Sequence, residues 1–308
     1  MTFENLQKIL TLKLTKGIGN KRGKEIIDKN QWDKVDFNNP LTKQKVEKEI
    51  EKIQKKKVSV VTLLDSNYPP LLKEIYDPPL ILYYFGNIDA HLPVAVVGTR
   101  NHTRYGAKAC SVFSQELTHG GATVVSGFAP GIDTIAHKAA VELKKPTIAV
   151  LGCGVDVNYP PENAKLKQEV FKNGGAIVSE FALETEPAVY HFPMRNRIIS
   201  GLSLALLMIE GKISSGALIT AKLAAEQGRS VYVLPGSVFE ESFLGNHTLL
   251  REGGILARSG SDILADLGHP TLIKEKEGEQ KESFLTKKQE FILTEEEKLV
   301  FELLETHT

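Results

Sequence analysis

Polar and glycine-rich segments follow several short apolar runs of the chain, and their residues have the chemistry to hold a phosphorylated ligand. The first segment runs from Gly98 to Gly106 and carries Arg100 and Arg104 beside the expected start of a helix. A guanidinium group, free backbone amides and a helix dipole together make a good phosphate site. This segment is therefore the first candidate for binding an anion.

Two further segments have similar chemistry. In the segment "SGFAPGID", Gly127 and Gly131 let the backbone approach an anion closely. The segment "EGKISSGALITA" opens a helix with hydroxyl groups and free amides, at Ser214, Ser215, Gly216 and Thr220. One such segment is a weak signal, but three at one edge of a sheet favour a phosphorylated ligand.

The segment "HFPMRNRIISG", from His191 to Gly201, combines an aromatic ring with phosphate partners. Phe192 lies close in sequence to Arg195, Asn196 and Arg197. This combination suits unpaired nucleic acid, in which stacking contributes about 1–3 kcal/mol per base. In the alternative interpretation, Phe192 covers a hydrophobic core and the arginines pair with Glu180 or Glu210, and the residue types alone favour neither.

Catalytic interpretations have less support. Asp133 and His137 are four residues apart on one helix face and have the types of an acid–base pair, but a capping aspartate beside a hydrogen-bonded histidine is favoured. Neither the GxxxxGK[ST] nor the GxGxxG pattern occurs. Cys110 and Cys153 are too few for a four-ligand zinc site. We therefore expect no catalytic residue, metal or cofactor.

The elements that position these segments alternate between strands and helices. Six apolar runs predict strands that are buried on both faces: 94–100, 124–133, 147–154, 176–180, 204–211 and 231–237, each with its turn. Helical patterns lie between and after them, at 105–119, 131–143, 162–173, 192–201, 215–228 and 246–253. Right-handed crossovers then give an α/β fold with a Rossmann-like, doubly wound, mainly parallel sheet. All the polar turns meet at the carboxyl edge of that sheet, where we expect the ligand.

Residues 1–57 predict a small helical domain. A Gly-Ile-Gly turn at 17–19 resembles a helix-hairpin-helix element with basic neighbours, although a packing module with a solvated basic face is favoured over DNA contact. The two proline pairs within residues 58–93 exclude a continuous helix, and "LILYYFGN" predicts a strand at or beside the edge of the main sheet. Residues 269–308 predict a linker and an amphipathic helix, which docks back or begins a truncated domain.

The composition is that of an ordinary globular protein. The chain has 308 residues, is 42% hydrophobic and 25% charged, and has a formal net charge of zero. No apolar run approaches the roughly 20 residues that span a bilayer, and no signal peptide is recognisable. We therefore expect a cytoplasmic protein without a membrane partner, and any polyanion site must be a local concentration of positive charge.

The order of the motifs identifies a resemblance. The motifs "YPPLL", "DPPLILYYFGN", "VAVVGTR", "SGFAPGIDTIAH", "SEF", "HFPMRNRIISGLS", "SSGALITAKLAAEQGR", "VLPGS" and "GNHTLLREGG" follow one another over residues 58–268. Together they resemble the DNA-processing protein A (DprA/Smf) family of bacteria. The resemblance implies an extended Rossmann-like domain that binds single-stranded DNA without known catalysis, protects incoming DNA in natural transformation and helps load the RecA recombinase. It also implies a homodimer, and it identifies residues 1–57 as a sterile-alpha-motif-like domain and the final helix as the start of a winged-helix-like domain.

The family's functional positions carry over by matching motifs. The predicted DNA-binding residues are Gly98, Thr99, Arg100, Arg104, Gly127, Phe192, Arg195, Asn196, Arg197, Ser215 and Gly216, and the predicted dimer or partner interface contains His247, Leu250 and Leu256. The resemblance implies that Arg100 holds a phosphate and that Phe192 stacks on a base. Two basic positions of many relatives are lost, since Pro130 and Val189 stand there, which predicts weaker or redistributed DNA contacts.

Two alternative functions remain. A related Rossmann-like group cleaves nucleoside monophosphates at the glycosidic bond through a "PGGxGTxxE" loop. The nearest stretch here has Gly216, Thr220 and Glu226 but lacks the double glycine. The other alternative is a protein–protein adaptor with a vestigial pocket, which the two lost basic positions support.

Overall fold

A nine-stranded mixed sheet forms the centre of the structure, a computed structural model in which residues 2–269 are described. The strand order is β1-β2-β6-β5-β4-β3-β7-β8-β9. Strands β3 to β9 pair in parallel, whereas β1 and β2 add antiparallel at one edge, as expected for residues 58–93. The strands are β1 (Ser59–Thr62), β2 (Ile81–Gly86), β3 (Val94–Val97), β4 (Val124–Ser126), β5 (Thr147–Val150), β6 (Ala176–Ser179), β7 (Ala205–Met208), β8 (Ser230–Val233) and β9 (Ile255–Leu256). The predicted doubly wound α/β fold is confirmed.

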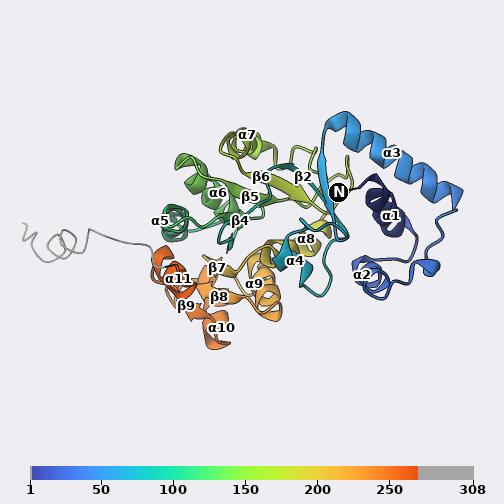
Figure 1. Cartoon of the computed structure of the whole chain (residues 1–308). Helices are drawn as coiled ribbons and strands as arrows, with labels where there is room; N and C mark the ends of the chain where they lie inside the picture. Colours follow the sequence, from blue (N-terminus) through green and yellow to red (C-terminus); the bar gives the residue numbers. More distant parts are fainter. Residues whose placement is uncertain (1, 270–308) are drawn as a thin grey trace, which may run out of the picture. The chain divides into compact units, whose positions relative to one another are not determined.

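Helices cover both faces of this sheet (Figure 1). Alternate residues of a strand point to opposite faces. Val94 and Val96 accordingly pack in one core cluster with α5, α6 and α11, while Ala95 and Val97 pack in the other with α8 and α9. These helices are α5 (Arg104–His119), α6 (Ile132–Glu142), α8 (His191–Gly201), α9 (Gly216–Glu226) and α11 (Gly260–Asp266). Two further helices flank the strands, α7 (Ala164–Lys172) and α10 (Leu244–Arg251), with the short α4 (Pro70–Lys73) after β1.

The strand order reverses between β3 and β7. From β3 the chain continues to β4, β5 and β6 on one side, and after β6 it returns to β7 and proceeds to β8 and β9 on the other side. The helices that follow β3 and β7 therefore diverge, which opens a crevice at the carboxyl ends of these two strands. Such a topological switch point is the usual ligand site of an open α/β sheet.

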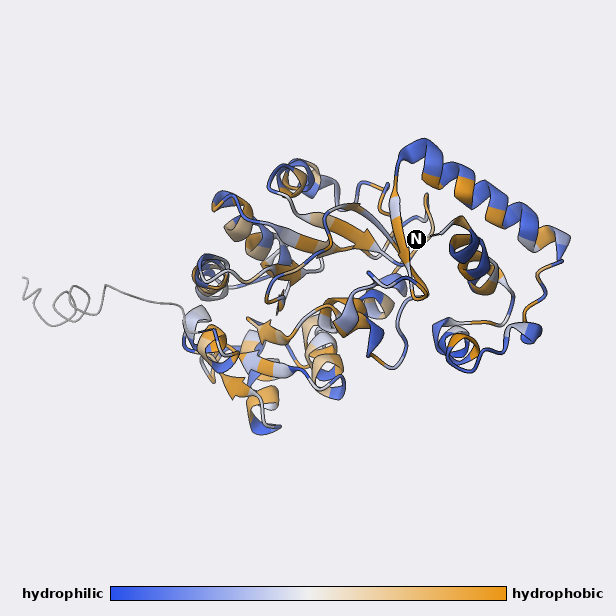
Figure 2. Cartoon of the chain, viewed as in Figure 1, coloured by the Kyte–Doolittle hydropathy of each residue, from blue (hydrophilic) through white to orange (hydrophobic). Residues whose placement is uncertain are grey.

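Three N-terminal helices pack beside β1 and β2 (Figure 1). They are α1 (Phe3–Leu14), α2 (Asn20–Asp28) and α3 (Pro40–Lys56). Figure 2 shows α3 as mostly hydrophilic with spaced hydrophobic positions, and Val46, Ile50 and Ile53 of this helix are buried. The division into domains at residue 57 stays a prediction.

A polar network joins these helices to the sheet. The Lys13 ammonium group donates to the Glu180 carbonyl oxygen after β6, and burial lowers the pKa of Lys13 to about 8. Glu49 of α3 accepts from the Leu183 amide at 3.0 Å. Residues 2–269 accordingly belong to one compact unit. The predicted C-terminal linker and helix lie outside the described residues, apart from His269.

Candidate functional site

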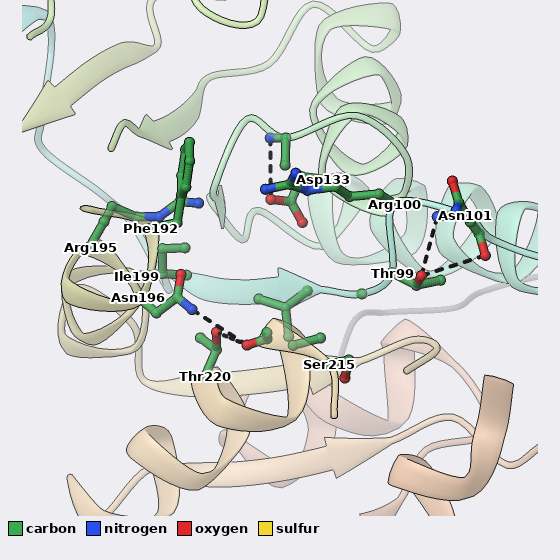
Figure 3. Close-up of a pocket in the computed structure, with 15 residues that line it drawn as sticks. Thr99, Arg100, Asn101, Asp133, Phe192, Arg195, Asn196, Ile199, Ser215 and Thr220 are labelled. Carbon is green, nitrogen blue, oxygen red and sulfur yellow. Dashed lines mark hydrogen bonds between the residues drawn. The ribbon is translucent and has the colours of Figure 1, made fainter. Parts of the chain in front are cut away.

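A cavity of about 330 Å³ lies at the carboxyl ends of β3 and β7, at the switch point (Figure 3). Phe192, Arg195 and Asn196 project from α8 on one side of it, while Arg100 and Asp133 lie across from them. Its lining contains Val97, Gly98, Thr99, Arg100, Asn101, Ala129, Asp133, Phe192, Arg195, Asn196, Ile199, Ser215, Gly216, Ala217 and Thr220. The predicted position of the ligand site, at the carboxyl edge of the sheet, thus coincides with a real cavity.

The N-terminus of α9 opens into this cavity. Ser215 is the N-cap, and its Oγ accepts from the Leu218 amide at 3.2 Å. The next two amides, of Gly216 and Ala217, have no acceptor among the described residues. A side chain added at Gly216 would meet no atom within 4 Å. Two free donors and the positive end of an 11-residue helix therefore face open space, which suits a phosphate.

The N-terminus of α5 is occupied from within the chain. The carboxylate of Glu210, which follows β7 and is fully buried, accepts from the Thr103 amide at 3.0 Å and from the Thr103 hydroxyl at 2.9 Å. A Cβ added at Gly106 would lie 2.0 Å from the same carboxylate. The expected phosphate site beside this helix is therefore filled by an acidic side chain. Arg104 is exposed but does not line the cavity.

Arg100 and Phe192 meet at the mouth of the cavity. The Arg100 guanidinium carbon lies 5.5 Å from the centroid of the Phe192 ring, which is a cation–π distance. The ring also lies against Gly152 and 5.8 Å from the Tyr159 ring. Arg100 is exposed and has no ion pair among the described residues. An unneutralised cation thus lies beside an aromatic ring that packs against the loop after β5.

Arg195 forms part of the cavity floor. Its Nη1 donates to the carbonyl oxygens of Gly127 and Val150, at the ends of β4 and β5. Burial lowers the pKa of Arg195 to about 10, and the nearby Asp133 carboxylate opposes this shift. Gly127 has room only for hydrogen because the guanidinium would lie 2.3 Å from an added Cβ. Arg195 therefore fixes α8, and with it Phe192, against the strand ends.

Arg197 lies outside this cavity. Its Nε is 2.8 Å from the Asp77 carboxylate and its Nη2 is 2.6 Å from that of Glu180. These contacts match the alternative interpretation of the motif, in which an arginine pairs with Glu180. The predicted DNA-binding set is thus divided: Gly98, Thr99, Arg100, Phe192, Arg195, Asn196, Ser215 and Gly216 line the cavity, whereas Arg104 and Arg197 do not, and Gly127 lies beneath Arg195.

Asp133 and His137 do not contact each other as an acid–base pair. The Nδ1 atom of His137 lies 2.8 Å from the Thr147 hydroxyl, which itself donates to the Val124 carbonyl. Burial lowers the pKa of His137 to about 3. Asp133 accepts from the Ala129 amide, and burial raises the pKa of its carboxyl. The expected hydrogen-bonded histidine is thus present, but Asp133 does not cap α6, whose N-cap is Gly131 without a side-chain hydrogen bond.

The glycosidase alternative lacks its carboxylate. Glu226 is the last residue of α9 and does not line the cavity, although Gly216 and Thr220 do. Among the cavity's described lining residues, Asp133 is the one carboxylate, and it faces Arg195. Within residues 2–269, no group of three histidine, cysteine or acidic side chains is arranged to hold a metal ion.

The residues predicted for a dimer or partner interface differ in exposure. Leu256 is 50% exposed on β9, which is an edge strand of the described sheet. Leu250 is partly buried against the core, and His247 Nε2 lies 3.1 Å from the Gly236 carbonyl. Exposed apolar residues on an unpaired edge are typical of an association surface. Only Leu256 of the three has that character.

Sequence reasoning missed the cap on α5 and part of the lining. Asn101, Ala129, Ile199 and Ala217 line the cavity without having been singled out, although each lies within a recognised motif. Glu210, which the alternative interpretation offered as a partner for the arginines, instead accepts from Thr103, and only its place at the end of the predicted 204–211 run indicated a position beside the site. None of the described helices combines the length and apolar character that a bilayer crossing requires.

Comparison with known proteins identifies a family for this chain. A family model described as DNA recombination-mediator protein A matches residues 59–268. Protein Smf of Escherichia coli is 43% identical over 202 residues, which cover 65% of this chain and 54% of that protein. DNA processing protein DprA of Streptococcus pneumoniae is 44% identical over 207 residues, covering 67% of this chain and 73% of that protein. The chain thus spans about half the length of the Escherichia coli relative.

Two solved structures are similar over most of the chain. The X-ray structure of DNA processing protein A from Streptococcus pneumoniae has a TM-score of 0.72 and 35% identity, covering 86% of this chain and 99% of that chain. DNA processing protein A from Helicobacter pylori, whose structure concerns its single-stranded DNA binding mode, has a TM-score of 0.61 and 31% identity, covering 68% of this chain and 95% of that chain.

Proposed function

This chain belongs to the family of DNA recombination-mediator protein A, and we propose that it binds single-stranded DNA in the cavity at the switch point, without catalysis. The observation that carries the proposal is the arrangement at the cavity mouth, where the Arg100 guanidinium lies 5.5 Å from the Phe192 ring beside the open start of α9. A cation, free amides and an aromatic face supply the two kinds of contact that an unpaired strand offers.

The phosphate contacts come from two sources. Arg100 supplies a cation that no described carboxylate neutralises, and the amides of Gly216 and Ala217 supply donors at a helix N-terminus. Such contacts release counterions, so the affinity falls with salt, with a slope of about −0.7 per phosphate contact on single strands. Because Pro130 and Val189 add no charge, the number of phosphate contacts here is small.

The aromatic contact provides the selection for single strands. A base that stacks on Phe192 must have a free face, which a duplex hides. Of the two amide side chains in the lining, that of Asn196 donates to the Gly216 carbonyl at 3.4 Å, and that of Asn101 lies on the side of Arg100. Stacking on one ring is sequence-tolerant because every base has a free face to offer.

We also propose that this binding serves recombination in the cytoplasm. The chain would protect incoming single strands in natural transformation and help load the RecA recombinase. A homodimer formed through Leu256 and the neighbouring exposed Ile255 on β9 would hold two lengths of strand and raise avidity. Light scattering of wild type and of a Leu256→Glu variant tests the dimer: we expect the variant to be monomeric, and an unchanged mass would rule this interface out.

Fluorescence anisotropy with labelled oligo-dT and a matched duplex, at several salt concentrations, tests the DNA proposal. We expect Phe192→Ala to weaken single-strand binding about tenfold or more, because stacking contributes about 1–3 kcal/mol per base. Phe192→Tyr keeps the ring and is the matched control. Arg100→Ala is expected to weaken binding and to reduce the salt slope by about 0.7. Equal binding of duplex and single strand, or two variants that bind like wild type, would refute the proposal.

A further inference from the structure

A second groove lies between the first turns of α8 and the start of α2. Tyr76, Met194 and Lys21 line it, together with the Arg197–Asp77 ion pair. Its volume is about 600 Å³. The DNA cavity and this groove share α8: Phe192 faces the cavity, and the next two residues, Pro193 and Met194, line the groove.

Tyr76 is exposed although its neighbours are anchored. Its side chain is 70% exposed, yet the preceding carbonyl, of Ile75, accepts from Lys24 at 3.1 Å. The following residue, Asp77, is bound by Arg197 at 2.8 Å. An exposed ring on a segment held at both ends loses little conformational entropy when a ligand stacks on it. Core packing does not require this arrangement, because the ring buries little surface.

The charge of the groove favours an anion beside that ring. Lys21 Nζ lies 4.5 Å from the centroid of the Tyr76 ring and has no ion pair among the described residues. The one carboxylate in the described lining, that of Asp77, is held by Arg197, which also pairs with Glu180 outside the groove. The groove therefore repeats the pair found in the cavity, where Arg100 lies over Phe192.

We propose that this groove is a second stacking subsite for the same DNA strand. A strand that places one base on Phe192 crosses the exposed Pro193 and Met194 and places a later base on Tyr76, with Lys21 on its phosphate. The proposal rests on the proposed function and extends it, because it gives the N-terminal helices a direct part in binding. The Lys21 ammonium group would also supply positive charge that Pro130 and Val189 lack.

Oligonucleotide length separates the two subsites. The experiment measures the affinity of the full chain for two oligo-dT lengths, about 4 and about 16 nucleotides. These lengths span the range of common single-strand site sizes. We expect Tyr76→Ala to weaken the long oligonucleotide about fivefold or more and to leave the short one, which fills only the cavity, within about twofold. Tyr76→Phe keeps the stacking face and should bind both like wild type.

The charge is tested separately by Lys21→Gln against Lys29→Gln. Both lysines are exposed, but Lys29 is at the opposite end of α2 and does not line the groove. Lys21→Gln should reduce the salt slope for the long oligonucleotide by about 0.7, and Lys29→Gln should leave it unchanged. If Phe192→Ala weakens both lengths while Tyr76→Ala weakens neither, the groove is not on the DNA path, and a protein segment becomes its candidate occupant. If Phe192→Ala weakens neither length, the proposed function itself is wrong.

Discussion

Helices α5 and α9 begin at the same edge of the sheet, on either side of the point where the strand order reverses, yet their N-termini differ. Glu210 lies against the first turn of α5 with its carboxylate fully buried, whereas the Gly216 and Ala217 amides of α9 face the cavity. A helix N-terminus attracts an anion from whichever source lies nearest. The difference shows that an acidic residue of the chain already holds one of these positions, so that the ligand is directed to the other.

The largest effect is expected when the Glu210 carboxylate is removed from the N-terminus of α5. Glu210→Ala removes the acceptor of the Thr103 amide and hydroxyl and leaves a buried space, which should lower the free energy of unfolding by about 3 kcal/mol. Urea denaturation measures this loss. Added phosphate should restore part of the stability of the variant and little of that of wild type, because the freed terminus becomes an anion site. A variant as stable as wild type would mean that Glu210 is not a cap.

The free energy of unfolding at acid pH has contributions from both the carboxylates and the buried His137. The contribution of His137 must be measured by itself before the effect of Glu210 is interpreted. The pKa of His137 is lowered from 6.5 to about 3, so its contribution to stability is fully present above about pH 6.5 and is lost as the pH falls toward 3. Between pH 6.5 and 5, wild type should lose about 2 kcal/mol more than His137→Gln, at about 1.4 kcal/mol per pH unit. Parallel stability curves for the two proteins would contradict this.

A carboxylate introduced at the N-terminus of α9 would reproduce the arrangement at the N-terminus of α5. A side chain at Gly216 meets no atom within 4 Å, so Gly216→Glu is expected to fold and to place a carboxylate near the free amides. Its affinity for oligo-dT should fall about tenfold, which corresponds to about 1.4 kcal/mol. Gly216→Gln has the same size without the charge and should retain most of the affinity. If the two variants bind equally well, the α9 terminus does not hold a phosphate.

The smallest effect is expected at the arginine beside the occupied terminus. Arg104 is exposed at the start of α5 but does not line the cavity. Arg104→Ala should therefore change oligo-dT affinity less than about twofold, whereas Arg100→Ala should cost about tenfold. Anisotropy titrations at one salt concentration suffice for this pair. A larger loss in Arg104→Ala would indicate that the strand also runs over α5.

Local patterns predicted the elements well. The helix expected at 105–119 begins at Arg104, and the one expected at 192–201 begins at His191, because apolar periodicity and turn residues act over a few positions. The contacts of Arg195 and Arg197 were not predictable to the same degree. Residues two apart on a helix point to different faces, but which face meets the cavity depends on how α8 packs.

The cap on α5 shows a second limit. Glu210 and Thr103 are far apart in sequence and meet only because β7 pairs with β3. That pairing follows from the strand order, which the alternation of strands and helices does not specify. The short strand β9 and helix α11 were also missed, since two residues and seven residues give little periodic signal.

The buried ammonium group of Lys13 has a consequence for how the chain unfolds. It is held by the Glu180 carbonyl, and the same glutamate binds Arg197 of α8 and Asn20 of α2. Separating the N-terminal helices from the sheet would remove the partners of Lys13 and of Glu49 at once. Thermal melting should therefore give a single calorimetric peak for residues 2–269, with equal van't Hoff and calorimetric enthalpies. The boundary at residue 57 would then divide the sequence without dividing the folding reaction. Exchanging this helical segment between relatives would require its partners after β6, Glu180 and Leu183, to be exchanged with it.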